Sequence, residues 1–230
     1  MKKKGKFIVI DGSDGSGKAT QVALLMKRLE QEGRTVKMVD FPEYYTNFFG
    51  GFIGECLADP KYEWLNVHPK IASIAYAADR WESKEKIEGW LKKGYVVVAN
   101  RYVSANQIHQ GGKIKDAKER KQFLRWLDDM EYRVFGIPRP DIVFYLSLPI
   151  AVTQKMMAER NKTQKRAYLR RKTDVHEDSI EFLENSRKSA LKLVKELNNF
   201  VKIECAPKKE ILSREAIHEM IYKEVKKIVK

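Results

Sequence analysis

The chain has 230 residues, 43% of them hydrophobic, which excludes a disordered protein and favours one globular domain over residues 1–230. Its net charge of +14, from 45 Lys and Arg against 31 Asp and Glu, makes a sizeable anionic partner such as a nucleotide or a nucleic acid worth considering. The two cysteines, Cys56 and Cys205, are far apart and lack metal-type spacing, which argues against disulfides and structural zinc.

The first residues, MKKKGKFIVID, are basic but carry an apolar run that is too short for the core of a signal peptide. No stretch of the sequence approaches the length of a membrane span. We therefore expect a cytoplasmic protein that has no membrane partner.

The first predicted strand covers residues 7–10, and a glycine-rich loop follows it. Residues 11–21 read DGSDGSGKATQ and lead into a predicted helix. Glycines between a buried strand and a helix let successive backbone N–H groups point at one anion, and Lys18 adds a positive charge. The usual pattern has Ser or Thr directly after this lysine, to hold magnesium, whereas this chain has Ala19 and then Thr20. We expect a phosphate site in which the loop coordinates magnesium only weakly. The residues predicted to bind the phosphates are Gly12, Ser13, Asp14, Gly15, Ser16, Gly17, Lys18, Ala19 and Thr20.

Apolar runs alternate with helix-like segments through the rest of the chain. Within each run the apolar residues follow one another directly instead of alternating with polar residues. This pattern is typical of strands in a parallel sheet that is covered on both faces. The predicted strands are 7–10, 35–41, 95–99, 141–148 and 200–206. The predicted helices are 20–32, with Ala23, Leu25, Met26 and Leu29 at helical spacing, then 69–93, 151–160, 176–198 and 214–230. The pattern predicts an α/β fold with a five-stranded parallel sheet between two layers of helices.

One segment has an unusual composition. Residues 160–172 read RNKTQKRAYLRRK and contain basic residues but no acidic ones. Most charge runs are solvated surface, but a lid that closes on a polyphosphate would need this composition. We expect a basic lid at about 160–173.

Five motifs follow one another in a fixed order along the chain. After the loop come DFPEY at 40–44, AYAADRWE at 75–82, NRYVSANQIHQGG at 100–112 and RPDIVFYLSLP at 139–149. Together they resemble the thymidylate kinase family, whose loop reads acidic-G-x-D-G-x-G-K-x-T-Q. The resemblance covers residues 6 to about 206 and implies a three-layer sandwich of the P-loop NTPase type with a mobile basic lid. It also implies phosphoryl transfer from ATP to dTMP with Mg²⁺, and a homodimer.

The resemblance implies an acceptor site that is assembled from several motifs. In the family an aromatic residue stacks on thymine, an arginine contacts the base and another arginine holds the acceptor phosphate; the matching residues are Tyr76, Arg80 and Arg101. The other implied acceptor-binding positions are Asp11, Phe41, Pro42, Tyr44, Asn106, His109 and Gln110. Taken singly, Tyr76 has the spacing of a core residue and Arg80 that of a surface ion-pair partner of Asp79 or Glu82. Only the ordered set of motifs supports their roles in binding.

The resemblance also implies a catalytic set. Phosphoryl transfer needs positive charge around the moving group, of which a loop lysine and magnesium supply part. In the family the remaining cation comes from an arginine directly after the loop aspartate or from the lid, and here Gly15 follows Asp14, so we expect a lid arginine. The implied catalytic residues are Lys18, Asp14, Arg101, Arg160, Arg166 and Arg170, with Arg171 a further lid candidate and Asp14 also the implied magnesium ligand.

Three positions depart from the family pattern. Asn100 replaces the aspartate of the D-R-Y motif, Ser147 replaces an aspartate on the fourth strand, and His109 replaces a tyrosine that helps recognise the sugar; Ala19 adds a departure from the general phosphate-loop pattern, at a position where the family varies. These departures leave two alternatives open: a kinase for another deoxynucleotide or a deoxynucleoside, and a nucleotide-binding protein without catalysis. Outside the lid, basic residues are interleaved with acidic ones, as in KEKIEGWLKK, which argues against nucleic acid as the partner.

Overall fold

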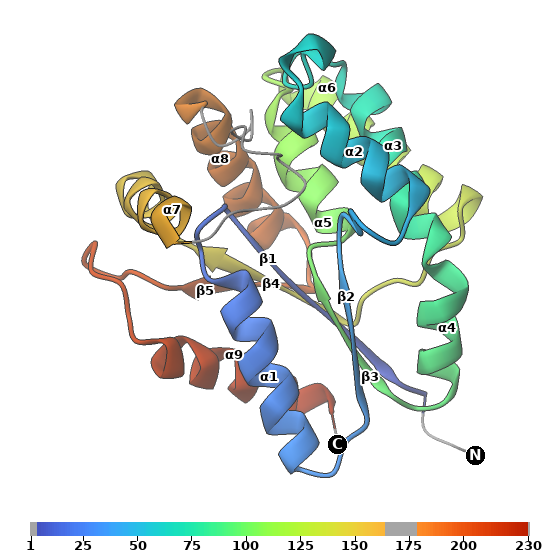
Figure 1. The fold of residues 1–230 in the computed structure, drawn as a ribbon, viewed down its shortest axis with the longest axis vertical. Helices are drawn as coiled ribbons and strands as arrows, with labels where there is room; N and C mark the ends of the chain where they lie inside the picture. Colours follow the sequence, from blue (N-terminus) through green and yellow to red (C-terminus); the bar gives the residue numbers. More distant parts are fainter. Residues whose placement is uncertain (1–3, 164–178, 230) are drawn as a thin grey trace.

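Five parallel strands form the centre of the computed structural model, which describes residues 4–163 and 179–229, with the backbone alone at 160–163. The strands are β1 (Lys6–Gly12), β2 (Val36–Asp40), β3 (Val96–Asn100), β4 (Ile142–Ser147) and β5 (Phe200–Glu204). Their order across the sheet is β2-β3-β1-β4-β5, and every neighbouring pair is parallel (Figure 1). The predicted five-stranded parallel sheet is confirmed.

Burial along the strands follows their position in the sheet. Every residue of β3 and β4 is buried, as is β1 after its first residue, because helices cover both faces of the central strands. The edge strands β2 and β5 have partly exposed residues between buried ones. All five strands are parallel, so their carboxyl ends lie along one edge of the sheet, where open α/β folds bind ligands.

Helices fill the two outer layers. The elements between β1 and β3 are α1 (Lys18–Gln31), α2 (Phe48–Ala58), the short 3₁₀ helix η1 (Pro60–Tyr62), α3 (Pro69–Glu82) and α4 (Lys84–Lys92). Those between β3 and β4 are α5 (Val103–Ala105), the π-helical turn η2 (Asn106–Gln110), α6 (Ala117–Asp128) and a second π-helical turn η3 (Asp129–Val134). The remaining helices are α7 (Ile150–Thr163), α8 (Ile180–Glu196) and α9 (Arg214–Ile228).

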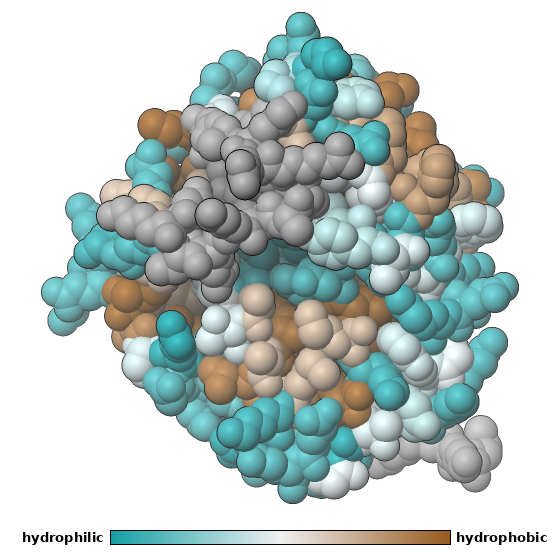
Figure 2. All heavy atoms as spheres, in the orientation of Figure 1, coloured by the Kyte–Doolittle hydropathy of each residue, from teal (hydrophilic) through white to brown (hydrophobic). Residues whose placement is uncertain are grey.

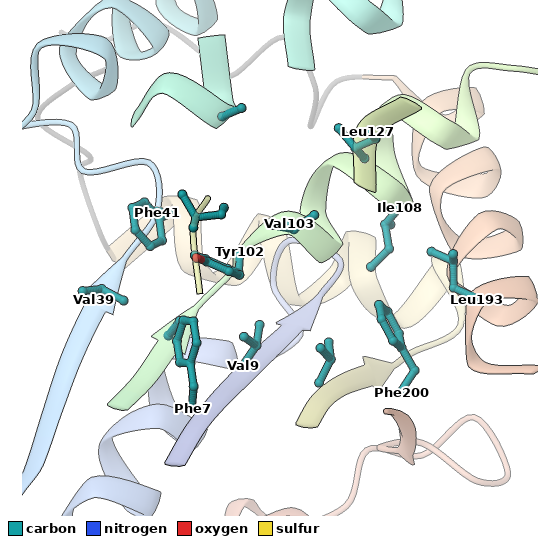
Figure 3. Packing of buried hydrophobic residues seen from close by; sticks show 14 of the residues in the cluster. Phe7, Val9, Val39, Phe41, Tyr102, Val103, Ile108, Leu127, Leu193 and Phe200 are labelled. Atoms are coloured by element: carbon teal, nitrogen blue, oxygen red, sulfur yellow. The ribbon is translucent and has the colours of Figure 1, made fainter. Parts of the chain in front are cut away.

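The core has two halves, one on each face of the sheet. Because successive strand residues point to opposite faces, Phe7 and Val9 of β1 lie in one half, and Ile8 and Ile10 in the other. The first half packs under α4, α6 and α8, and Figure 3 labels Leu127 of α6 and Leu193 of α8; the second half packs under α1 and α9 (Figure 1). These are the three layers that the sequence predicts.

Two details of the predicted helices are wrong. The segment 69–93 forms two helices rather than one, because Ser83 leaves the helical path and its hydroxyl donates to Glu43, 2.8 Å away. In α1, Ala23 is exposed, and the buried face is instead made by Val22, Leu25 and Leu29. The predicted helix at 214–230 is confirmed as α9, whose inner face includes the buried residues Ile217, Ile221 and Val225.

Neither terminus lies at the carboxyl edge of the strands. The described chain starts just before β1 and ends after α9, and both ends lie toward the bottom of Figure 1, away from the loop that follows β1. The predicted helix at 176–198 is described from Ile180 onward, and most of the predicted lid lies outside the described residues. Among the described helices, none has the length and apolar character needed to cross a membrane.

Candidate active site

The glycine loop connects the carboxyl end of β1 to the start of α1. Gly15 and Gly17 have φ angles of +76° and +86°, a backbone region that glycine enters at little cost. Apart from its own neighbours in the chain, no described atom lies within 4 Å of a Cβ built on Gly17, so the space beside it is open. Gly17 is also the N-cap of α1 and has no side chain with which to cap the helix. The loop and the first turn of α1 therefore present backbone N–H groups to open space, as an anion site requires.

The loop is held from the side by α7. The hydroxyl oxygens of Ser13 and Thr153 lie 3.3 Å apart. A Cβ on Gly15 would lie 3.0 Å from Cγ of Met157, so a larger residue there would push α7 away. The helix that leads toward the predicted lid thus packs directly on the loop.

Lys18 lies folded within the loop. Its Nζ donates to the carbonyl oxygens of Gly12 and Ser13, at 3.1 and 2.9 Å, and lies 3.5 Å from a carboxylate oxygen of Asp14. Burial, followed by the nearby charge of Arg101, lowers the pKa of Lys18 to about 8. A bound polyphosphate would offer Lys18 the compensating negative charge.

Arg101 reaches the loop from the end of β3. Its Nη2 donates to Asp14, so Asp14 joins the two cations of the site. Burial by itself would lower the pKa of Arg101, but the carboxylates of Asp14 and Asp11 raise it above its ordinary value. The backbone of Arg101 has a φ of +63°, a region that non-glycine residues rarely enter. Such strain is common where a side chain must be aimed at a functional site.

Asp11 lies beneath the loop, with no exposed surface. One of its carboxylate oxygens accepts from the backbone N–H of Gly12 at 2.8 Å, and the other accepts from the hydroxyl of Ser104 at 2.5 Å. Although the family resemblance implied contact with substrate, this position gives Asp11 a supporting role, in which it fixes the start of the loop.

Asp40 is an acidic residue of the site that the sequence analysis did not single out. It ends β2 and is the register partner of Asn100 at the end of β3. Partial desolvation raises the pKa of Asp40, while Arg101, Lys18 and a hydrogen bond from Asn100 oppose the rise. In the described part of the chain, Oδ1 of Asn100 is buried without a hydrogen-bond partner. Asp40 lies near the end of a predicted strand, at the carboxyl edge of the sheet that also carries the loop, and this position could have identified it from the sequence.

Arg80 and Asn106 meet on one buried carboxylate. Nε and Nη2 of Arg80 donate to the two oxygens of Glu131, at 2.8 and 2.5 Å, and Nδ2 of Asn106 donates to the same carboxylate at 3.1 Å. Arg80 is only 2% exposed, so the expected alternative of a surface pair with Asp79 or Glu82 does not form. Glu131 lies on η3, far along the chain, and no motif marked it.

The aromatic residues assigned to the acceptor pocket have different environments. Tyr76 is half-buried, and its hydroxyl accepts from Nε1 of Trp64 at 3.0 Å. Phe41 belongs to the core, where its ring packs on Tyr102 (Figure 3). Pro42 and Tyr44 are half-buried, whereas His109 and Gln110 are buried on η2. Nη1 of Arg101 lies 2.9 Å from His109, which ties this group to the loop.

The lid arginines cannot be placed from the described side chains. Arg160 falls in α7, where only the backbone is described, and Arg166, Arg170 and Arg171 lie outside the described residues. Any magnesium ligands in the described part of the chain must come from the oxygen groups around the loop. Among the described residues, no group of three or more His, Cys, Asp or Glu side chains is arranged to hold a metal ion.

Comparisons with known proteins agree on one family. A family model described as thymidylate kinase matches residues 10–217. The thymidylate kinase of Plasmodium falciparum is 32% identical over 183 residues, which cover 77% of this chain and 80% of that protein. The thymidylate kinase of Homo sapiens is 29% identical over 153 residues, 66% of each chain. A solved thymidylate kinase from Candida albicans shares the fold, with a TM-score of 0.71 at 20% identity, over 99% of this chain and 94% of that one.

Proposed function

Because this chain belongs to the thymidylate kinase family, it transfers a phosphoryl group from ATP to dTMP, and we propose that the loop after β1 binds the triphosphate while Arg101 binds the acceptor phosphate. The observation that carries this proposal is the cluster of Lys18, Asp14 and Arg101 at the carboxyl ends of β1 and β3. It places two cations beside the uncapped start of α1, where phosphate groups bind.

The two cations divide the charge of the reaction between them. Lys18 exchanges the carbonyls of Gly12 and Ser13 for phosphate oxygens of ATP, since those carbonyls are weaker partners for an ammonium group. Arg101 uses one amino group for Asp14 and another for His109, and its remaining N–H donors face the acceptor phosphate. Little covalent chemistry is needed, because positioning and charge neutralisation carry phosphoryl transfer.

The oxygen groups around the loop fit magnesium. Asp14 and Asp40 offer carboxylates, and Asn100 offers an unpaired carbonyl oxygen; oxygen is the ligand that Mg²⁺ prefers. Because Mg²⁺ usually keeps several waters and takes further oxygens from phosphates, two carboxylates suffice for a bound ATP complex. When bound, the ion neutralises phosphate charge. Asp40 would then supply the carboxylate that is missing at Asn100.

The lid arginines Arg160, Arg166 and Arg170 are proposed to supply the remaining positive charge, with Arg171 as a further candidate. The basic composition of 160–172 and the packing of α7 on the loop support this assignment. An arginine that contacts the transferred group contributes a large share of catalysis in phosphoryl-transfer enzymes.

The acceptor nucleoside is proposed to lie between the loop and α3. Tyr76 supplies the stacking face, and Arg80 with Asn106 forms a rigid polar floor built on Glu131. Pro42, Tyr44 and Gln110 lie at the edges of this space, while Asp11 and Phe41 support it from beneath.

A homodimer is proposed from exposed apolar residues on two neighbouring helices. Ile71, Ile74 and Trp81 follow one another at helical spacing on α3, and Phe48 and Phe52 do so on α2. Figure 2 shows apolar side chains gathered at the upper right, over α3. Exposed apolar patches of this kind mark interfaces. The proposed location is the cytoplasm, which agrees with two free, buried cysteines.

The experiment that tests the function is an acceptor panel. Purified protein is mixed with ATP, Mg²⁺ and one of dTMP, dUMP, dGMP or thymidine, and ADP release is followed against a control without acceptor. Turnover that is selective for dTMP supports the proposal, since a wrong base leaves buried polar groups unpaired. Turnover with another acceptor would indicate a related kinase, and ATP binding without turnover would indicate a non-catalytic protein.

A further inference from the structure

A chain of polar contacts runs from the phosphate loop to α8 through Arg101 and His109. Arg101 donates to Asp14 through Nη2, and its Nη1 lies 2.9 Å from Nε2 of His109. The other ring nitrogen of His109, Nδ1, lies 3.0 Å from Oγ of Ser186. His109 and Ser186 are 9% and 3% exposed, so water does not compete strongly for either contact.

The contact between Arg101 and Nε2 of His109 fixes the protonation state of His109. A guanidinium group has N–H donors and no acceptor, so Nε2 of His109 must carry a lone pair in order to accept from Arg101. A neutral imidazole then carries its proton on Nδ1, which donates to Ser186.

The ring has little freedom to leave this position. Phe182 of α8 is stacked on it, with ring centroids 5.6 Å apart and planes inclined by 14°. The turn η2 is itself fixed to α8, because Ser189 donates to the carbonyl of Gln107 at 3.1 Å. The imidazole that contacts Arg101 is therefore itself held in a fixed position by α8.

We infer that His109 is a positioning residue: as a neutral imidazole protonated on Nδ1, it aims the guanidinium of Arg101 at the acceptor phosphate. The inference rests on the proposed role of Arg101 and adds a residue that replaces the tyrosine of the family motif. Among the described residues, the ring contacts Arg101 at the end of β3, and Ser186 and Phe182 on α8; of these three, Arg101 is the charged one. A proton on Nε2 would set two cationic donors against each other and release Arg101.

Nitrogen NMR of the substrate-free protein tests the tautomer. The protein is labelled with ¹⁵N-histidine, and the ring signals of His109 are identified by their absence from His109→Gln. At about pH 8 we expect a proton-bearing Nδ1 and an unprotonated Nε2. An unprotonated Nδ1, or protons on both nitrogens, would overturn the inference. This readout needs no turnover, so it separates a failure of the inference from a failure of the proposed function, which appears as no ADP from the wild-type protein.

Kinetics of two matched variants test the positioning. Gln at position 109 keeps an acceptor near Nε2 and cannot titrate, whereas His109→Leu removes the acceptor at every pH. At about pH 8 we expect His109→Leu to raise KM for dTMP by about tenfold, a loss of about 1.4 kcal/mol, with a smaller effect on kcat and on KM for ATP. His109→Gln should stay within about threefold of wild type. Equal KM values for the two variants would contradict the inference.

The pH dependence adds a readout that packing alone would not move. As the pH falls from about 8 to about 5.5, KM of the wild-type protein for dTMP should rise relative to that of His109→Gln, because imidazole titrates in this range. Titration of the dTMP phosphate affects both proteins equally and cancels in the ratio. If His109→Leu does not fold, Ser186→Ala keeps the ring and removes the partner of Nδ1; because Arg101 still donates to Nε2, its His109 should keep the proton on Nδ1. A constant KM ratio, or a proton that moves to Nε2 in Ser186→Ala, would count against the inference.

Discussion

Individual residues of the site differ in what the sequence can reveal. Lys18 was predicted from its glycine neighbours alone, because a loop between strand and helix has few other uses for a lysine. Asp11 and Arg80 matched motifs equally well, yet both are buried and held by partners that the sequence analysis did not single out, Ser104 and Glu131. Motifs thus identified which side chains gather at the site, and packing decided which of them are buried beneath it.

The lowered pKa of Lys18 predicts that ATP binding takes up a proton above about pH 8. A bound polyphosphate favours the ammonium form, so the pKa of Lys18 rises from about 8 on binding, and the affinity for ATP falls as the pH increases through this range. Calorimetry at about pH 9, in two buffers with different ionisation enthalpies, measures the uptake. Lys18→Arg keeps the charge but does not titrate, so it should show no uptake. Equal proton uptake by both proteins would exclude Lys18 as its source.

Among the carboxylates on the acceptor side, we expect the neutralisation of Glu131 to lower the free energy of unfolding most. Glu131→Gln leaves the Arg80 guanidinium buried without a charge partner, which should lower the free energy of unfolding by about 3–5 kcal/mol in urea denaturation. The control is Asp129→Asn on the same turn, where the pair that is removed, with Arg133, is exposed and screened by water, so the free energy of unfolding should change little. Similar losses in the two variants would mean that the buried pair contributes no more to stability than the exposed pair.

At the scale of elements, α2 and α3 are joined by a small polar cluster. The carboxylate of Asp79 on α3 accepts from the backbone N–H of Glu43 and from Asn47, the N-cap of α2, at 3.2 and 2.9 Å. Burial, opposed by these hydrogen bonds, raises the pKa of Asp79 to about 6. The two helices can approach this closely because Gly50 lies between them.

Gly50→Ala should therefore be strongly destabilising, whereas Gly51→Ala should not. A Cβ at Gly50 would lie 2.2 Å from the carbonyl oxygen of Glu43 and 2.9 Å from Asp79, and the backbone atom cannot easily give way. We expect a loss of about 1–3 kcal/mol in urea denaturation. At Gly51 the nearest atom is 3.7 Å away, so alanine should be neutral or should add up to about 1 kcal/mol through helix propensity. A Gly50→Ala variant as stable as Gly51→Ala would contradict this account.

The elements themselves show where sequence reasoning succeeds and where it fails. The strands were predicted because continuous apolar runs have a simple cause, burial on both faces. The helix α2 was missed because its sequence, FFGGFIGECLA, combines apolar residues with glycines and has no clear polar face. The break between α3 and α4 was missed because it depends on Ser83 and Glu43, which contact each other only after folding.

At the scale of the whole molecule, the net charge of +14 did not identify the partner by itself. The charge fits a polyphosphate ligand once the loop, Lys18 and Arg101 are seen together, whereas a nucleic-acid surface would need a continuous basic stripe. The predicted three-layer architecture holds across the described chain, with the acceptor side and the phosphate side meeting at the carboxyl edge of one sheet.

The proposed dimer makes a prediction about the same molecule in solution. Light scattering should give the mass of two chains, and Ile74→Glu on α3 should convert the protein to single chains, because a charge is costly in an apolar interface. Ile211→Glu is the matched control, since Ile211 is equally exposed but follows β5, at the opposite edge of the sheet from β2. A single-chain mass for the wild-type protein, or dissociation by both variants, would argue against this interface.

The position of the chain ends bears on how the protein can be handled. Both ends of the described chain lie away from the carboxyl edge of the sheet, so a fusion partner or a surface tether at either end would leave the phosphate loop open to solution. A sensor chip that captures the protein by its carboxyl end would therefore leave the phosphate loop accessible to the flowing sample.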